Sequence, residues 1–192
     1  MSMVSTAKMT ARQFLMLGED PPGVRLELVD GEIAVSASPL PRHSYVEKAL
    51  SRVVGNHIDE HDLGLLLGDT DTIFGEHDVR RPDLIYFSKS RQHLVREDRA
   101  IEGMPDLCAE IVSPSSSTID RRDKFKQYAA GGVPCYWIVD PQKLSFEGFE
   151  LKDGDYVLVA QARGTESITL SPFPLLKIAL GKLWFPAQSS QP

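Results

Sequence analysis

The fold of this chain is decided by residues 106–140, which read DLCAEIVSPSSSTIDRRDKFKQYAAGGVPCYWIVD. An apolar run at 106–112 precedes a polar turn, an amphipathic segment, a Gly-Gly-Val-Pro break and a second apolar run at 135–139. Two short apolar runs joined by a helical segment are typical of a crossover between parallel strands. The sequence therefore predicts an α/β sheet with this unit at its centre.

Glu110 is a carboxylate in the middle of the first apolar run, beside Leu107, Ile111 and Val112. An unpaired buried carboxylate is costly, so the fold must supply a metal ion, a cation or a proton at this point. The helical segment that follows supplies candidate cations. Glu110 is therefore the first candidate site residue.

Length and composition are those of one soluble domain. The chain has 192 residues, 42% hydrophobic and 25% charged, which suffices for a single domain over 1–192 with its core at about 10–185. No apolar run approaches a membrane span, and the first ten residues, MSMVSTAKMT, lack the apolar centre of a signal peptide. We expect a cytoplasmic protein without a membrane anchor.

The net charge of −6 argues against a general affinity for nucleic acid, but it allows a local basic groove. Basic residues do crowd the crossover helix, at Arg121, Arg122, Lys124 and Lys126. No Cys/His spacing predicts a zinc site, and no glycine-rich phosphate loop or Gly-x-Ser-x-Gly elbow is present. Cys108 and Cys135 are expected to be buried thiols.

The rest of the chain alternates strands with two further helices. A short helix follows Thr10, its N-cap, and Asp30-Gly31 joins a hairpin in which Glu27 lies opposite Leu26 and Leu28. The strand face that carries Glu27 is either exposed to solvent or part of a cleft. The remaining expected elements are a helix at 44–60, strands at 64–67 and 70–74 with a turn at 68–69, a strand opened by Asp83, a loop at 88–105, strands at 143–151 and 156–160, and a strand or turn at 175–184.

Asp83 and Glu110 form the candidate metal site. Each lies on a mostly apolar strand, and two such strands side by side would bring both carboxylates to one point. Mg²⁺ and Mn²⁺ favour one or two carboxylates, a carbonyl and waters, and the carbonyl of Ile111 is a natural third ligand.

Lys124 is the candidate cation above this pair. Asp120, Lys124 and Tyr128 share one helix face, and Phe125 and Ala129 are expected to face the sheet. A lysine there could position the attacking water and neutralise phosphate charge.

Each of these features also has a structural explanation. Asp120 and Lys124 could form a surface pair, Asp83 could cap a turn after its proline, and His43 could serve helix entry rather than catalysis. Glu110 is harder to explain in that way.

The ordered motifs ELVDGEI (27–33), SPLPRH (38–43), RPDLIYF (81–87), PDLCAEIVSPSS (105–116) and GVPCYWIVDP (132–141), with Asp120, Lys124 and Tyr128 between the last two, resemble the Uma-type putative restriction endonuclease family of the PD-(D/E)XK nuclease superfamily. The resemblance covers about residues 10–160. It implies a restriction-endonuclease-like α/β fold: a mixed central β-sheet flanked by helices, extended by N- and C-terminal hairpins.

The resemblance also assigns roles. Asp83 and Glu110 match the two family acids. Val112 stands where the superfamily lysine is usual, and Lys124 matches a lysine that has moved to the following helix. Glu27 matches a further family acid and Tyr128 a family tyrosine.

The implied activity is Mg²⁺- or Mn²⁺-dependent hydrolysis of DNA phosphodiester bonds, with a homodimer as the form that cuts both strands. Two rival functions remain: a catalytically silent binding or regulatory module, and a hydrolase of small phosphodiesters.

Overall fold

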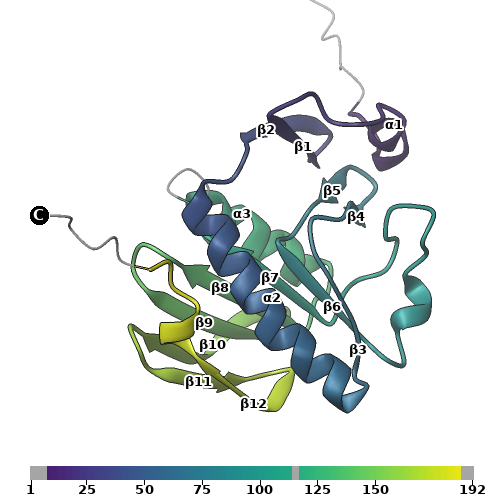
Figure 1. Ribbon diagram of the computed structural model, residues 1–192. Coiled ribbons are helices and arrows are strands. Elements are labelled where there is room, and N and C mark those ends of the chain that lie inside the picture. The colour runs from purple at the N-terminus through teal and green to yellow at the C-terminus, as the bar shows by residue number, and fades with distance from the viewer. Residues whose placement is uncertain (1–7, 114–116, 187–192) are drawn as a thin grey trace, which may run out of the picture.

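The computed structural model describes residues 8–113 and 117–186 and is a mixed α/β fold (Figure 1). The helices are α1 (Ala11–Leu15), α2 (Pro41–His61) and α3 (Ser117–Ala130), with 3₁₀ turns at Gln92–Leu94 and Leu180–Lys182. The strands are β1 (Val24–Val29), β2 (Glu32–Ala37), β3 (Gly64–Leu67), β4 (Thr72–Gly75), β5 (Asp78–Arg80), β6 (Leu84–Ser88), β7 (Leu107–Ile111), β8 (Cys135–Asp140), β9 (Ser145–Lys152), β10 (Asp155–Arg163), β11 (Ser167–Leu170) and β12 (Phe173–Ala179).

The central sheet has six strands in the order β10-β9-β8-β7-β6-β3. β7 and β8 run parallel and are joined by α3, and the other neighbours are antiparallel. This confirms the crossover expected from residues 106–140. Every residue of β7 and β8 is buried, as strands covered on both faces require.

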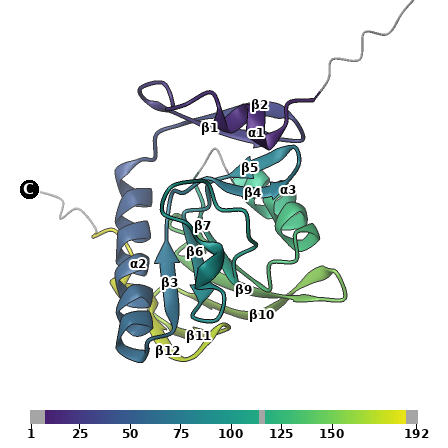
Figure 2. The same cartoon turned by 90° about the vertical axis from the view of Figure 1, so that its right-hand side faces the viewer.

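The sheet is the middle layer of three. α2 and the β11–β12 hairpin cover one face, and α3 lies on the other (Figure 2). Alternate residues of each strand enter the two cores: Ala109 and Trp137 pack on the α2 side, and Cys108 and Tyr136 on the α3 side. Cys108 and Cys135 are buried thiols, as predicted.

The N-terminal hairpin does not extend the central sheet, contrary to the sequence expectation. β1 and β2 pair as predicted around Asp30-Gly31, but they join β5 and β4 in a separate sheet of order β2-β1-β5-β4. The turn at Gly68-Asp69 therefore does not make a hairpin: β3 pairs with β6, and β4 pairs with β5. This small sheet sits above one end of the central sheet (Figure 1).

The C-terminal half matches the expectation in part. The β9–β10 hairpin extends the central sheet, whereas β11 and β12 form a two-stranded sheet of their own. No helix in residues 8–113 and 117–186 is long and apolar enough to cross a membrane.

The two long helices differ from expectation, α2 in its start and α3 in the extent of its buried face. α2 begins at Pro41, three residues before the expected start, so His43 lies within its first turn. Phe125 and Ala129 pack against the core on the α3 side of the sheet, as predicted. Among the described α3 side chains, at 121–130, Lys124 and Tyr128 are the buried ones, at 8% and 0% exposure. Lys124 therefore also faces the sheet. The side chain of Asp120 lies outside the described residues.

Replacing Gly64 by Ala is expected to destabilise the fold by about 2 kcal/mol or more. Gly64 has φ +144°, and a Cβ there would lie 2.1 Å from the carbonyl oxygen of Phe87, on the strand that β3 pairs with. Urea unfolding measures the loss. Gly154→Ala is the matched control, because Gly154 also has a positive φ of +90° but its Cβ would meet no atom within 4 Å; it should cost about 1 kcal/mol. Equal losses of stability in Gly64→Ala and Gly154→Ala would contradict the steric clash expected at Gly64.

Candidate active site

Asp83 immediately precedes β6, and Glu110 lies on β7, the strand that pairs with β6. β6 and β7 are antiparallel with Leu84 opposite Ala109, so continuing the register by one residue sets Asp83 opposite Glu110. Directly opposed residues point to the same face with Cβ atoms about 4.5–5.5 Å apart. Both carboxylates are almost fully buried, at 5% and 2% exposure. The pairing expected from their positions in the sequence is therefore present.

Glu110 receives two donors from α3. Lys124 Nζ lies 2.7 Å from Glu110 Oε2, and the hydroxyl of Tyr128 donates to Glu110 Oε1 at 2.7 Å. Burial and the nearby charge of Glu110 raise the pKa of Tyr128 well above its usual value. Tyr128 therefore stays a protonated donor at every physiological pH. The cation that the buried carboxylate demands is Lys124.

Asp83 is held from three sides. The backbone amide of Ile111 donates to Asp83 Oδ2 at 2.7 Å, His43 Nε2 lies 3.2 Å from the same oxygen, and Arg25 lies 3.6 Å from Oδ1. Burial alone would raise the pKa of Asp83, but His43, Lys124 and the Ile111 amide outweigh it and lower the pKa. Asp83 is therefore an ionised carboxylate whose partners come from other elements, and not a turn cap.

Glu27 lines the same centre from the small sheet. It accepts from the Arg81 amide at 2.8 Å and from Arg80 at 3.2 Å, and Arg80 also donates to Gln127 of α3 at 2.7 Å. Burial raises the pKa of Glu27, but the charges of Lys124 and Arg80 and the Arg81 amide outweigh it and lower the pKa. Glu27 therefore faces the interior and not solvent, and through Arg80 it ties the small sheet to α3.

Each carboxylate of the centre has a Lys or Arg partner. Glu110 pairs with Lys124, Glu27 with Arg80, and Asp83 with Arg25. All the predicted side chains come together here: Asp83, Glu110, Lys124, Tyr128 and Glu27. Sequence reasoning gave no role in the site to Arg25 or Arg80. The alternation of β1 puts Arg25 on the same face as Glu27 and could have indicated it.

The two opposed carboxylates fit a hard divalent cation. Within the described parts of the chain, no three His, Cys, Asp or Glu side chains are grouped so that they could hold a metal ion by themselves. This excludes an all-side-chain cage there, of the kind that binds structural zinc. Mg²⁺ needs only one or two carboxylates, because it keeps several waters and takes substrate phosphates as ligands. The oxygen donors of Asp83 and Glu110 suit that mode.

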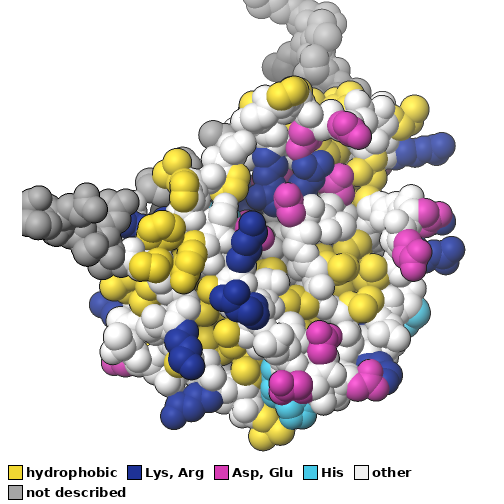
Figure 3. Space-filling model, viewed as in Figure 1, with side chains coloured by type: hydrophobic (Ala, Val, Ile, Leu, Met, Phe, Trp, Pro, Cys, Tyr) yellow, Lys and Arg dark blue, Asp and Glu magenta, His cyan; other side chains and the backbone are white. Residues whose placement is uncertain are grey.

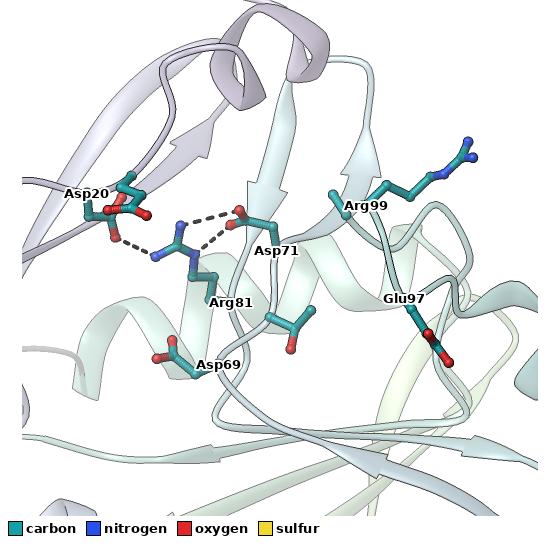
Figure 4. Close-up of a pocket in the computed structure, with 9 residues that line it drawn as sticks. Asp20, Asp69, Asp71, Arg81, Glu97 and Arg99 are labelled. Atoms are coloured by element: carbon teal, nitrogen blue, oxygen red, sulfur yellow. Dashed lines mark hydrogen bonds and ion pairs between the residues drawn. The ribbon is translucent and has the colours of Figure 1, made fainter.

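An acidic pocket of about 500 Å³ adjoins the centre, between the small sheet and the loop at 94–101 (Figure 4). Arg81 lies in the wall of this pocket. The Nε atom of Arg81 lies 2.5 Å from Asp71, and Arg81 also pairs with Asp20. Asp69, on the same wall, pairs with Arg25 at 2.7 Å. The remaining charged lining residues are Glu19, Glu97 and Arg99. The pocket is therefore braced by its own ion pairs.

His43→Gln is expected to destabilise the protein most at mildly acidic pH. Burial lowers the pKa of His43, but the hydrogen bond and charge of Asp83 outweigh it and raise the pKa above 6.5. Because folding raises the pKa of His43, the ion pair stabilises the protein fully below the pKa that His43 has in the unfolded chain. This stabilisation is lost as pH rises through the pKa of His43 in the folded protein. Folding lowers the pKa of Asp83, so its share of the stabilisation is lost as pH falls through the pKa of Asp83 in the folded protein. The difference in free energy of unfolding between wild type and His43→Gln should be largest between about pH 4 and 6.5, which are the pKa values of Asp and His in the unfolded chain.

Urea titrations of wild type and His43→Gln at pH 5.5 and 8.5 measure that difference. The exposed His93 serves as the control position, and His93→Gln should change the free energy of unfolding by less than about 0.5 kcal/mol at either pH. A loss for His43→Gln that is equal at both pH values would contradict the ion pair.

Comparisons with known proteins find a matching family model and a similar sequence. The Uma2 family model, described as "Putative restriction endonuclease", matches residues 11–181. An uncharacterized protein of Synechocystis sp., slr1290, is 26% identical over 138 residues, which cover 69% of this chain and 70% of that protein.

A solved structure has the same fold. The crystal structure of a putative nuclease belonging to DUF820 from Anabaena variabilis superposes with a TM-score of 0.75 and 20% sequence identity, over 92% of this chain and 97% of that chain. At this identity the likeness extends to the arrangement of strands and helices alone.

Proposed function

We propose, since this chain belongs to the Uma2 family of putative restriction endonucleases, that it hydrolyses DNA phosphodiester bonds with Mg²⁺ or Mn²⁺ on a restriction-endonuclease-like fold. One observation carries the proposal: Asp83 and Glu110 are buried opposite one another, with Lys124 2.7 Å from Glu110. Two acids and a lysine at one point are the groups that metal-assisted phosphodiester hydrolysis uses.

Each residue of the site has a separate role in the proposed reaction. Asp83, Glu110 and the carbonyl of Ile111 would hold the metal ion, which when bound polarises the scissile phosphate and lowers the pKa of water. The Lys124 ammonium orients the attacking water and offsets the charge that develops on the phosphate. Tyr128 fixes the Glu110 carboxylate through its 2.7 Å hydrogen bond. Glu27 acts indirectly, because it holds Arg80 and thereby α3.

Cleavage assays test this function. Purified protein is incubated with supercoiled plasmid, single-stranded DNA and a small aryl phosphodiester, each with Mg²⁺, Mn²⁺ or EDTA. We expect metal-dependent nicking of DNA and none in EDTA. Turnover of the small ester alone would replace DNA with a small phosphodiester as the substrate. Cleavage that persists in EDTA would contradict the proposal.

One observation favours a silent binding module as the second candidate. The cations nearest the carboxylate pair already have acidic partners: Lys124 has Glu110, Arg80 has Glu27, and Arg25 has Asp69. An internally neutralised centre can serve stability alone. Absence of cleavage on every substrate, together with DNA binding that needs no metal, would select this candidate.

A homodimer is part of the proposal, because a two-fold axis presents two such centres to the two antiparallel strands of a duplex. Light scattering of the purified protein, with and without a DNA duplex, measures the mass. A monomer in both conditions that still makes double-strand breaks would contradict it.

A further inference from the structure

The outer face of α2 and the segment beside it carry unpaired basic side chains. We call this group the α2 band: Arg42, Lys48, Arg52, Lys177 and Lys182, all exposed. Among the residues that the structure describes, none of the five makes an ion pair, whereas Arg25, Arg81 and Arg91 do. In Figure 3 Lys and Arg side chains follow α2 and the C-terminal segment, while Asp, Glu and His gather at the far end of the helix. The α2 band is therefore a surface of uncompensated positive charge on an acidic protein.

Two ring contacts hold the two halves of the band together. His57 packs on Phe173 with ring centroids 5.8 Å apart, and Tyr45 packs on Phe185 at 5.3 Å. β12 and the turn after it thus run alongside α2 in the opposite direction, from His57 back to Tyr45. Lys177 and Lys182 lie between these two contacts in the chain and so flank the helix.

The band begins at the wall of the candidate active site. His43, next to Arg42 in the first turn of α2, contacts Asp83 at 3.2 Å. Lys48 and Arg52 follow Tyr45 at spacings of three and four residues, which keeps them on one helix face. From Arg42 to Arg52 the helix spans about 15 Å at 1.5 Å per residue, the length of about four base pairs at 3.4 Å each.

The centre itself offers little free positive charge to a polyanion. On α3, Arg121 pairs with Glu147 and Lys124 pairs with Glu110, so the basic groove expected over this helix is largely neutralised. Arg122 and Lys126 are exposed without an ion pair in the described residues, but the exposed Asp123 lies between them. Charge for backbone binding therefore comes mainly from α2.

We infer that the α2 band binds the phosphate backbone of duplex DNA and leads it to the carboxylate centre. The inference rests on the proposed function, for which it supplies the substrate-binding surface. Several Lys and Arg side chains without acidic partners are the feature that phosphate binding by counterion release requires. The half-exposed rings of Tyr45 and Phe185 lie within the band and would contact the sugar edge.

The test is DNA binding in EDTA, where hydrolysis does not interfere. Fluorescence anisotropy with a labelled duplex is measured across salt concentrations for wild type and Lys48→Gln/Arg52→Gln. The matched control is Arg12→Gln/Arg96→Gln, which removes the same charge from exposed positions that also make no ion pair in the described chain. The band variant should bind about tenfold more weakly or worse, and its slope of log K against log salt should fall by about 1.8, at 0.9 per phosphate contact. The control should stay within about twofold.

Three outcomes would overturn the inference. Equal weakening in both double variants would mean that only net charge matters. If the wild-type protein cleaves DNA and the band variant binds DNA as tightly as wild type, the role of the α2 band is refuted while the nuclease function stands. Wild-type binding to vesicles of anionic phospholipid but not to DNA would identify a membrane surface instead. Binding through the band without cleavage in Mg²⁺ or Mn²⁺ would refute the nuclease and leave the band.

Discussion

Replacing Lys124 by Met is expected to reduce DNA cleavage by about 10²–10⁴-fold, the usual contribution of a positioned proton-transfer or charge-stabilising group. Lys124 is 8% exposed, lies 2.7 Å from Glu110, and is the cation nearest that carboxylate. The Met side chain keeps the apolar stem and removes only the ammonium. Single-turnover rates on supercoiled plasmid measure the effect.

The same change should also destabilise the protein, because it removes the ammonium that pairs with the buried Glu110 carboxylate. Breaking a buried pair from one side costs about 3–5 kcal/mol. Lys124→Met/Glu110→Gln removes both charges and should recover most of that stability while remaining inactive. This double variant separates lost chemistry from lost folding.

Tyr128→Phe is the control for Lys124→Met, since it removes a different donor to the same carboxylate. Its cost should be about 1–2 kcal/mol of stability, with a rate within about tenfold of wild type, because a positioning hydrogen bond carries less than the reacting group. A Lys124→Met protein that cleaves as fast as Tyr128→Phe would refute the role given to Lys124.

Asp83→Asn should lower the cleavage rate by at least about 10²-fold, because it removes one of the two carboxylate charges proposed to hold the metal ion that polarises the phosphate. Asn has nearly the same shape and can still accept from the Ile111 amide, which Asp83 now contacts at 2.7 Å. The fold should therefore survive, and circular dichroism and urea unfolding check this.

Asp69→Asn is the matched control for Asp83→Asn. Both carboxylates face Arg25, at 2.7 Å for Asp69 and 3.6 Å for Asp83, but only Asp83 lies opposite Glu110. Asp69→Asn should leave the rate within about threefold, the scale of a surface ion pair. Similar losses in the two variants would mean that Arg25, and not the carboxylate pair, is the essential group.

The central crossover could be predicted because its signals are local and mutually consistent. Two apolar runs, a helical segment and a Gly-Gly-Val-Pro break leave one arrangement for residues 106–140. Glu110 could be assigned for the same reason, since a carboxylate within an apolar strand has few structural explanations. The structure adds its partners, Lys124 and Tyr128.

The full buried face of α3 could not be predicted from amphipathicity. Phe125 and Ala129 pack on the sheet as predicted, but Glu110 also lies beneath the helix and needs donors. Lys124 and Tyr128 therefore turn inward as well, and a polar requirement set by another strand widens the buried face beyond the apolar positions.

Sheet membership was the other failure. β4 and β5 are short, four and three residues, and a turn signal at Gly68-Asp69 looks the same whether the next strand pairs back or crosses to another sheet. Pairing of β1 with β5 joins residues about fifty positions apart, through Leu28 and Val79. Contacts of that range depend on the whole fold and leave no periodic trace in the sequence.

The central claim is that Asp83 and Glu110 hold a divalent metal ion, and calorimetric titration of Mg²⁺ and Mn²⁺ into wild type and Glu110→Ala tests it most directly. Unfolding curves first establish that the variant is folded, and Glu97→Ala, which removes an exposed carboxylate of the neighbouring pocket, serves as the control. We predict binding to wild type and to the control, and its loss in Glu110→Ala. Binding that is unchanged in Glu110→Ala, or absent from wild type even with a DNA duplex present, would contradict the account.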